Sequence, residues 1–291
     1  MPSLKAIRRR IQSVKNTQKI TRAMKMIASV KLRRAQAKIL AMRPYAKRTF
    51  DIINDILLEV EKGEHPLIEK REEKKIMLLV FTSDRGLCGS FNSNILRNTE
   101  KFIEEKREEG KEILISVIGK KGFNYFDYHK IKVEHYFKDI LVEPSLEKIK
   151  VDVASKIMDQ FIERRFDAFY MIYNEFKSVI SQKVTVEKLL PIEPVVKEER
   201  EVKDFIFEPN KTEILNRLLP MYVEIELYRV LLESIASEYG ARMTAMDNAT
   251  ENAEEMIANL TLQFNKARQA MITKELMDII GGAEAQRKAM S

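Results

Sequence analysis

The chain has 291 residues, of which 45% are hydrophobic and 33% charged, and its formal net charge is +7. Such a composition is typical of a soluble, ordered, helix-rich protein and argues against a disordered one. No apolar run approaches the roughly 18 residues that a membrane-spanning helix needs, so we expect no segment that crosses a membrane. One cysteine and the lack of an apolar signal segment predict no disulfide framework and a reducing, cytoplasmic compartment.

Charge is distributed unevenly along the chain. Residues 1–50 contain fifteen Lys or Arg and no Asp or Glu, whereas residues 211–280 contain seven basic and eleven acidic residues. Elements of opposite charge attract each other. The sequence therefore predicts that the two ends of the chain associate, with positive charge left over for an acidic partner.

The N-terminal part follows a seven-residue repeat. Two series of positions alternate at spacings of three and four, which is the pattern of a coiled-coil seam. One series is Ile7, Val14, Thr21, Ala28, Ala35 and Met42, and the other is Leu4, Ile11, Gln18, Lys25, Leu32, Ile39, Ala46 and Ile53. The repeat predicts one helix over about residues 3–58, in which Pro44 is a point where the helix can bend.

The C-terminal part carries a similar repeat over residues 221–260 that continues, after a one-residue drift, to Met271. Proline suits the first position of a helix, so we expect the long helix to begin at Pro220, after a short helix over Lys211–Leu218. The glycine pair at 281–282 predicts that the helix weakens or ends there.

The segment between these repeats alternates apolar strands with helical patterns. Predicted strands are Lys74–Phe81, Lys111–Gly119, Ile131–Phe137, Phe166–Phe176 and Ser181–Ile192, and predicted helices are Asn92–Glu109, Lys120–Tyr128 and Ser145–Arg165. This alternation indicates an α/β domain with a mostly parallel sheet of about five strands. The last two strands read as a hairpin, which makes one edge of the sheet antiparallel.

These patterns divide the chain into three parts. We predict an N-terminal coiled-coil helix in residues 1–68, an α/β domain with flanking linkers in residues 69–210, and a C-terminal coiled-coil helix in residues 211–291. Because the inserted domain must bring its two ends close together, the helices pair most simply as one antiparallel two-stranded coil.

The stretch "SDRGLCG", residues 83–89, follows a strand and precedes a helix, where α/β folds place ligand sites. It contains neither GxGxxG nor GxxxxGK[ST], so it lacks both phosphate-binding patterns. Cys88 as a nucleophile needs a histidine base, and no motif places His65, His129 or His135 beside it. A structural turn, with Gly86 and Gly89 supplying backbone freedom, is favoured over a catalytic one.

Other kinds of site are weakly supported or absent. One cysteine and three scattered histidines lack the paired spacing of a zinc site, and no carboxylates have calcium-loop spacing, so we expect no metal and no cofactor. The basic helix leaves nucleic-acid binding open as an alternative, although its charges are spread out and lack interleaved aromatic residues. An enzyme built on the α/β domain is a third and weaker hypothesis.

Three long motifs resemble those of one family. They are "IRRRIQSVKNTQKITRAMKMIASVKLRRAQ" near the start, "SDRGLCGSFNSN" in the middle and "RMTAMDNATENAEEMIANLTLQFNKARQAMITKELMDIIGGAEA" near the end. In this order and spacing they resemble the gamma subunits of F-type ATP synthases over essentially the whole chain.

The resemblance implies a function without catalysis on this chain. It implies an antiparallel coiled-coil shaft and a Rossmann-like domain that binds no nucleotide. The shaft would stand inside a head of three alpha and three beta subunits, with the domain beside the epsilon subunit and the ring of c subunits. Proton flow would turn the ring and the shaft, and the beta subunits would make or hydrolyse ATP. The resemblance places the complex on the cytoplasmic face of a bacterial cell membrane, with this chain as a peripheral subunit.

The resemblance also implies contact residues. Met24 and Lys25 match the region that faces the lower part of beta, and Lys25 adds a charge where related sequences can be acidic. A hydrogen-bonding catch to the head is matched by Arg268, Gln269, Thr273 and Glu275. A foot near epsilon and the c ring is matched by Phe205, Phe207 and Glu208, with Phe at two positions where the family often has Tyr. No regulatory cysteine pair occurs between residues 191 and 213, so thiol regulation is not expected.

Overall fold

The structure is a computed structural model that describes residues 3–59, 65–194 and 210–289. It divides into two compact units. We call residues 1–27 with 245–291 the terminal unit, and residues 28–244 the central unit. The boundaries predicted after residues 68 and 210 mark changes in the sequence pattern, whereas the two units are defined by contacts in space. Those boundaries therefore stay predictions.

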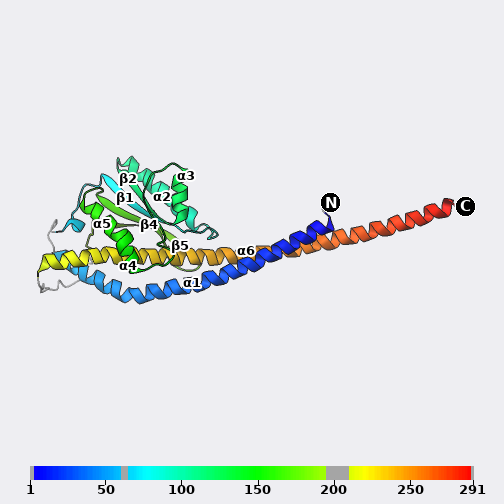
Figure 1. The fold of residues 1–291 in the computed structure, drawn as a ribbon, viewed down its shortest axis with the longest axis horizontal. Coiled ribbons are helices and arrows are strands. Elements are labelled where there is room, and N and C mark those ends of the chain that lie inside the picture. The colour runs from blue at the N-terminus through cyan, green and yellow to red at the C-terminus, as the bar shows by residue number, and fades with distance from the viewer. Residues whose placement is uncertain (1–2, 60–64, 195–209, 290–291) are drawn as a thin grey trace. The chain divides into compact units, whose positions relative to one another are not determined.

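Two long helices dominate the chain, as the repeats predict: α1 spans Leu4–Glu59 and α6 spans Lys211–Ala289. Every predicted seam position of α1 is buried or half-buried. Both helices are numbered in Figure 1 and lie side by side within each unit. None of the described helices combines the length and the apolar character that spanning a membrane requires.

The predicted start of the C-terminal helix is wrong, and the helix does not end at the glycine pair. Pro220 lies inside α6, and the helix continues through Gly281 and Gly282. A proline inside a helix costs about 3 kcal/mol. Around Pro220 this cost is offset by burial, because Leu219 and Val223 are fully buried. Glycine lowers helix stability by only about 1 kcal/mol per residue and does not forbid the conformation.

The central unit contains a five-stranded sheet with the order β3-β2-β1-β4-β5. The strands are β1 (Lys75–Phe81), β2 (Glu112–Ile118), β3 (Val133–Phe137), β4 (Ala168–Phe176) and β5 (Gln182–Leu190). All neighbouring pairs are parallel except β4 and β5, which are antiparallel. The predicted fold class, a mixed α/β sheet inserted between two paired long helices, is confirmed.

The shorter helices connect these strands. They are α2 (Phe91–Glu108), α3 (Lys120–Tyr128), α4 (Leu146–Ile149) and α5 (Ser155–Ile162), with a 3-10 turn at Pro66–Ile68. The single helix predicted over 145–165 is wrong in detail, because a π-helical turn at Lys150–Ala154 separates α4 from α5. The wider turn keeps Ile149, Val153 and Ile157 together on the buried face.

Alternating side chains of the buried strands fill two cores. Met77, Leu79 and Phe81 of β1 pack with residues of α1, α5 and α6. On the other face, residues such as Ile76 and Leu78 pack with α2 and with Phe126 of α3. Figure 1 shows α2 and α3 on one side of the sheet and α6 on the other. The C-terminal helix is therefore part of the core of the central unit.

Two glycines with positive φ form a matched test of this packing. Gly119 (φ 99°) follows β2, and a Cβ added there would lie 2.1 Å from the carbonyl oxygen of Thr82. Gly110 (φ 78°) ends α2, and an added Cβ would meet nothing within 4 Å. We expect Gly110→Ala to destabilise the unit by about 1 kcal/mol through backbone strain alone. Gly119→Ala should cost a further ~1–3 kcal/mol because the backbones must separate.

The measurement is urea denaturation followed by near-ultraviolet circular dichroism of the aromatic side chains. Equal midpoints for the two variants would show that the contact between Gly119 and Thr82 does not constrain the fold.

Candidate functional site

The coil of the terminal unit has a narrow and partly polar seam. Thr21 and Thr250 share a buried hydrogen bond of 2.7 Å between their hydroxyl oxygens, and Lys25 Nζ lies 2.5 Å from Asp247 Oδ1. The order of these contacts along the two helices is that of an antiparallel pair, as predicted. Because threonine is small, the helices approach closely at this point.

The predicted contacts Met24 and Lys25 lie at the edge of this seam. Both are half-buried, and the Lys25 side chain is 36% exposed while it pairs with Asp247. Their neighbours Met26 and Ile27 are more than half exposed. One face of this turn thus joins the two helices, while the other offers apolar surface to the outside.

Little of the predicted attraction between the helices is realised as ion pairs here. Within the described part of α1 that belongs to the terminal unit, Lys25 is the only basic residue that forms an ion pair. The others are exposed: Lys5, Arg8, Arg9, Arg10, Lys15, Lys19 and Arg22. The surplus positive charge therefore faces solvent or a partner.

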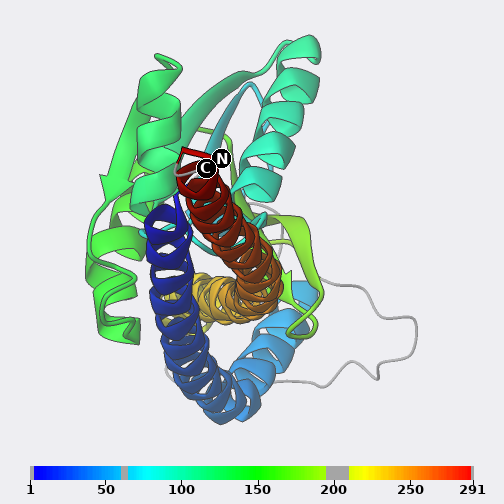
Figure 2. The same cartoon turned by 90° about the vertical axis from the view of Figure 1, so that its right-hand side faces the viewer.

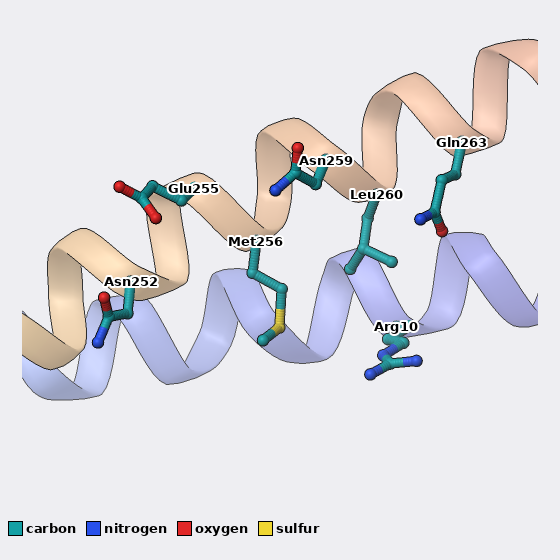
Figure 3. A pocket seen from close by; sticks show the side chains of 7 residues that line it. All are labelled: Arg10, Asn252, Glu255, Met256, Asn259, Leu260 and Gln263. Carbon is teal, nitrogen blue, oxygen red and sulfur yellow. The ribbon is translucent and has the colours of Figure 1, made fainter.

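A shallow groove of about 340 Å³ lies between the two helices of the terminal unit. Figure 3 shows Met256 and Leu260 of α6 pointing towards α1, with Arg10 of α1 near Leu260. The remaining lining residues are Asn252, Glu255, Asn259 and Gln263. The groove is open and mixes polar with apolar groups, so it has the character of a contact surface rather than an enclosed ligand site.

The last part of α6 lacks the burial seen earlier in the helix. All side chains described from Arg268 onward are exposed. Six of them are large and apolar: Met271, Ile272, Leu276, Met277, Ile279 and Ile280. At 3.6 residues per turn they cover more than half of the helix circumference. A helix that is apolar most of the way round is normally enclosed by protein.

The four predicted catch residues lie on this exposed part of α6 (Figure 2, where it is dark red). Arg268 and Glu275 are seven positions apart and share a face, whereas Gln269 and Thr273 share the neighbouring one. The Thr273 hydroxyl donates to the Gln269 carbonyl at 3.0 Å. In the described structure Arg268, Gln269 and Glu275 have no side-chain hydrogen bond or ion pair, so their polar ends are available. The predicted foot residues Phe205, Phe207 and Glu208 lie outside the described residues.

The loop after β1 is a closed structural turn. Cys88 is only 2% exposed, and its sulfur contacts Ser83, Asn92 and the Arg85 carbonyl. Burial raises the pKa of the Cys88 thiol, which opposes thiolate formation. The expected backbone freedom is found at Gly89 (φ 57°), but the assignment to Gly86 is wrong, since Leu87 has the other positive φ, 62°.

The three histidines have other partners. His65 accepts from the amide of Leu67, His135 bonds to Gln160, and His129 packs against Tyr125. Across the described ranges no group of three or more His, Cys, Asp or Glu is arranged to hold a metal ion.

A charged cluster that sequence reasoning missed joins α6 to the sheet. We call Arg229, Glu187, Glu226, Glu233 and Tyr173 the Arg229 cluster. Arg229 donates twice to Glu187 at 2.8 Å, once to Glu226 at 2.7 Å and once to Glu233 at 3.3 Å. The Tyr173 hydroxyl donates to Glu187 at 2.7 Å. Three carboxylates around one guanidinium leave an excess of negative charge in a mostly buried place.

Burial changes the pKa of two acids of the cluster. Burial raises the pKa of Glu226 and of Glu233, and the opposing pull of Arg229 does not cancel it. One oxygen of Glu233 is buried without a hydrogen-bond partner among the described residues. Glu187 comes from β5, far away in sequence, and the acids of α6 fit an ordinary helical charge pattern, so no local signal identifies the cluster.

Comparison with known proteins gives one consistent result. A family model described as "ATP synthase" matches residues 3–286. The ATP synthase gamma chain of Geobacter metallireducens is 46% identical over 286 residues, which are 98% of this chain and 99% of that protein. The ATP synthase gamma chain of Sorangium cellulosum is 44% identical and covers 99% and 100% of the two chains.

Solved structures agree with these sequences. A chain in the central stalk and c-ring structure of the Tetrahymena thermophila mitochondrial ATP synthase is 25% identical, with a TM-score of 0.59, over 79% of this chain and 99% of that chain. A chain of the Euglena gracilis mitochondrial ATP synthase in its OSCP/F1/c-ring structure shares the fold, with 19% identity and a TM-score of 0.71 over 99% and 96% of the two chains.

The raised pKa of Glu233 gives a pH prediction. A carboxyl group whose pKa is higher in the folded state binds its proton more tightly there, so its stabilising effect is present at low pH and is lost as the pH rises through the folded pKa. Glutamine at this position cannot titrate. We expect the wild-type chain to lose more stability than Glu233→Gln between about pH 5 and about pH 8.

The measurement is the urea midpoint of both chains across this range. The control is Glu104→Gln on the exposed side of α2, which should follow the wild-type curve. Parallel curves for wild type and Glu233→Gln would contradict the assignment.

Proposed function

The chain belongs to the family of ATP synthase gamma chains, non-catalytic rotor subunits of F-type ATP synthases, and we propose that its two long helices form the shaft that couples rotation to ATP synthesis or hydrolysis. It is part of an ATP synthase with an F1 head and a c ring, as are the chains in the related structures. The observation that carries the mechanism is the exposed end of α6, where apolar side chains lie on most of the circumference without a partner in the terminal unit.

The proposed partners follow from the two kinds of surface on the shaft. The apolar end of α6 suits a sleeve of protein on all sides, which three alpha and three beta subunits around an axis would provide. The exposed basic side chains of α1 suit acidic surfaces of beta. Rotation changes the state of a beta subunit only if the shaft contacts its states differently. A shaft whose faces differ in charge and apolarity satisfies that condition.

We assign the lower contact to Met24 and Lys25. The pairing with Asp247 holds the Lys25 ammonium close to the coil and balances part of its charge. The neighbouring exposed side chains of Met26 and Ile27 add an apolar contact that slides easily, because hydrophobic attraction has no preferred direction. This combination favours brief contacts that re-form at each step of rotation.

The remaining assignments concern the catch and the foot. Arg268, Gln269, Thr273 and Glu275 would form the hydrogen-bonding catch to the head. Phe205, Phe207 and Glu208 would form the foot near epsilon and the c ring. The chain would lie on the cytoplasmic face of a bacterial cell membrane as a peripheral subunit, and its similarity to the gamma chains of Geobacter metallireducens and Sorangium cellulosum supports that placement. Nucleic acid has no part in this function.

The catch gives a prediction about coupling. Gln269→Leu should lower coupled ATP synthesis by about tenfold, because one hydrogen bond to a charged or polar group of the head is lost. The α/β domain should stay folded, since Gln269 is exposed and remote in sequence from the sheet. The control is Asn265→Leu, which also replaces an amide side chain by leucine at an exposed position of α6. Synthesis at the wild-type rate in the Gln269→Leu complex would contradict the assignment of Gln269 to the catch.

Reconstitution gives a prediction about assembly. The purified chain, mixed with alpha and beta subunits, should form a complex with one copy per three alpha-beta pairs, and ATP hydrolysis should rise when it is present. Size-exclusion chromatography with an ATPase assay measures both. If no complex forms, the shaft function fails for this chain, and the basic helix should then be tested for salt-dependent binding to DNA.

A further inference from the structure

The carboxyl ends of the parallel strands form the side of the sheet at which this fold binds ligands, and here that side lies next to α6 within the central unit. We call it the ligand-binding edge. From β1 the chain proceeds to β2 and β3 on one side, and β4 then lies on the other side of β1. In such sheets ligands bind at the carboxyl ends of the strands where this reversal occurs. Here that place is formed by the loop after β1, residues 82–90, and by the end of β4.

The loop binds a side chain of the protein itself. Arg242 Nη2 donates to the carbonyls of Arg85 at 3.1 Å and Gly86 at 3.3 Å, and its Nη1 donates to Glu238 Oε1 at 2.7 Å. Arg242 is 8% exposed and Glu238 is 7% exposed. We call Arg242, Glu238 and the two carbonyls the α6 lock. A buried, hydrogen-bonded guanidinium thus occupies the edge at which this fold binds ligands in other proteins.

The neighbouring helix terminus is also occupied by protein groups. At the N-terminus of α3 the amides of Lys120, Lys121 and Gly122 donate to Asp84 Oδ1, the Ser83 carbonyl and Thr82 Oγ1. Free amides at a helix N-terminus can bind an anion, and these three are already bonded to groups of the protein. With the amides bonded and the loop carbonyls bound to Arg242, the edge is closed by the chain's own polar groups.

Further bonds attach the same stretch of α6 to β4 and its hairpin. The Ser237 hydroxyl donates to the Asn174 carbonyl at 2.8 Å, and the Thr244 hydroxyl donates to the Val179 carbonyl at 3.2 Å. Asn174 in turn donates to the carbonyl of Phe91, at the start of α2. The helix is therefore bonded on successive turns to two different loops at one edge of the sheet.

We propose that the α6 lock is a joint through which torque passes between the α/β domain and the shaft, with Arg242 taking the place of the ligand that this fold would otherwise bind. The torque role rests on the proposed function; the existence of the lock does not. The apolar core holds α6 against the sheet through contacts that have no preferred direction. Hydrogen bonds from a buried guanidinium are directional and strong.

The geometry explains why this joint resists rotation. A side-chain group lies ~6 Å from a helix axis, so turning α6 by about 20° would move it by ~2 Å. That movement breaks the hydrogen bonds of 3.1 Å and 3.3 Å from Arg242 to the loop carbonyls, whereas the bond from Arg242 to Glu238 lies within α6 and turns with it. The movement would leave Arg242 Nη2 and the two loop carbonyls without these hydrogen bonds in a mostly buried place, which is unfavourable.

The only cysteine of the chain reports on the lock directly. Cys88 lies in the same loop, two residues after Gly86, and is buried. Its reaction with a thiol reagent such as 5,5′-dithiobis(2-nitrobenzoate) measures how often the loop opens. We expect the double variant Arg242→Met/Glu238→Met to raise this rate by about tenfold or more, since bonds to a buried charged group are lost. Replacing both residues leaves no unpaired charge, so the variant should fold.

A matched control exists before β1, at the opposite edge of the sheet. Arg71 also pairs with a glutamate, Glu69, and donates to a backbone carbonyl, that of Phe161, at 2.9 Å. Arg71→Met/Glu69→Met should leave the Cys88 rate unchanged. Removal of Arg242 by itself would raise the thiol pKa and removal of Glu238 would lower it, so the charges in the double variant oppose each other. Equal rates for wild type and Arg242→Met/Glu238→Met would overturn the lock.

The torque role is tested in the reconstituted, membrane-bound complex. The ratio of protons pumped to ATP hydrolysed should fall at least several-fold in Arg242→Met/Glu238→Met and stay at the wild-type value in Arg71→Met/Glu69→Met. An unchanged ratio together with faster Cys88 labelling would overturn the torque role and keep the lock. Failure of the wild-type chain to assemble would overturn the proposed function and the torque role with it, whereas the labelling result on the isolated chain would stand.

Discussion

The packing of α6 against the sheet is the contact on which the rest of the central unit depends. Leu219, Val223, Leu227, Val230 and Leu231 are all fully buried. Each such side chain contributes ~1.5–3 kcal/mol of gross burial energy, so these five together exceed the net stability of many domains before entropy is subtracted. This interface fixes the position of α6. The Arg229 cluster and the α6 lock can form only because the helix is held there.

The burial of side chains then decreases along α6. This decrease matches a rotor in which one part of the helix is anchored in the α/β domain and the other part contacts partner subunits. Up to about Arg242 the helix is core, and between Met246 and Leu260 it buries one narrow face. From Arg268 it buries nothing in the described structure. One continuous helix thus offers a fixed end for the domain and a free end for partners. The polar and charged contacts lie where orientation matters, and apolar surface remains where the shaft must turn.

The sequence predicts periodic features well and contacts between distant segments poorly. Heptad spacing identifies α1 and most of α6, and the alternation of strands and helices identifies the sheet and its antiparallel edge. Pro220 misleads because burial by Leu219 and Val223 outweighs a local rule. The Arg229 cluster and the α6 lock have no local pattern, since Glu187 and the Gly86 carbonyl come from segments far from α6 in sequence. Gln269 and its neighbours are identified only through the resemblance to the family motif, and their contacts with other subunits stay predictions.

The antiparallel pairing of the chain's two ends has a consequence for synthesis. Thr21 meets Thr250 and Lys25 meets Asp247, so α1 leaves the ribosome long before the residues that cover its seam exist. Contacts across such a distance in sequence form late and slowly. During that interval the nascent chain presents a basic helix with an uncovered apolar stripe. Its surplus of like charges then has a second effect, because it keeps newly made chains apart until α6 arrives.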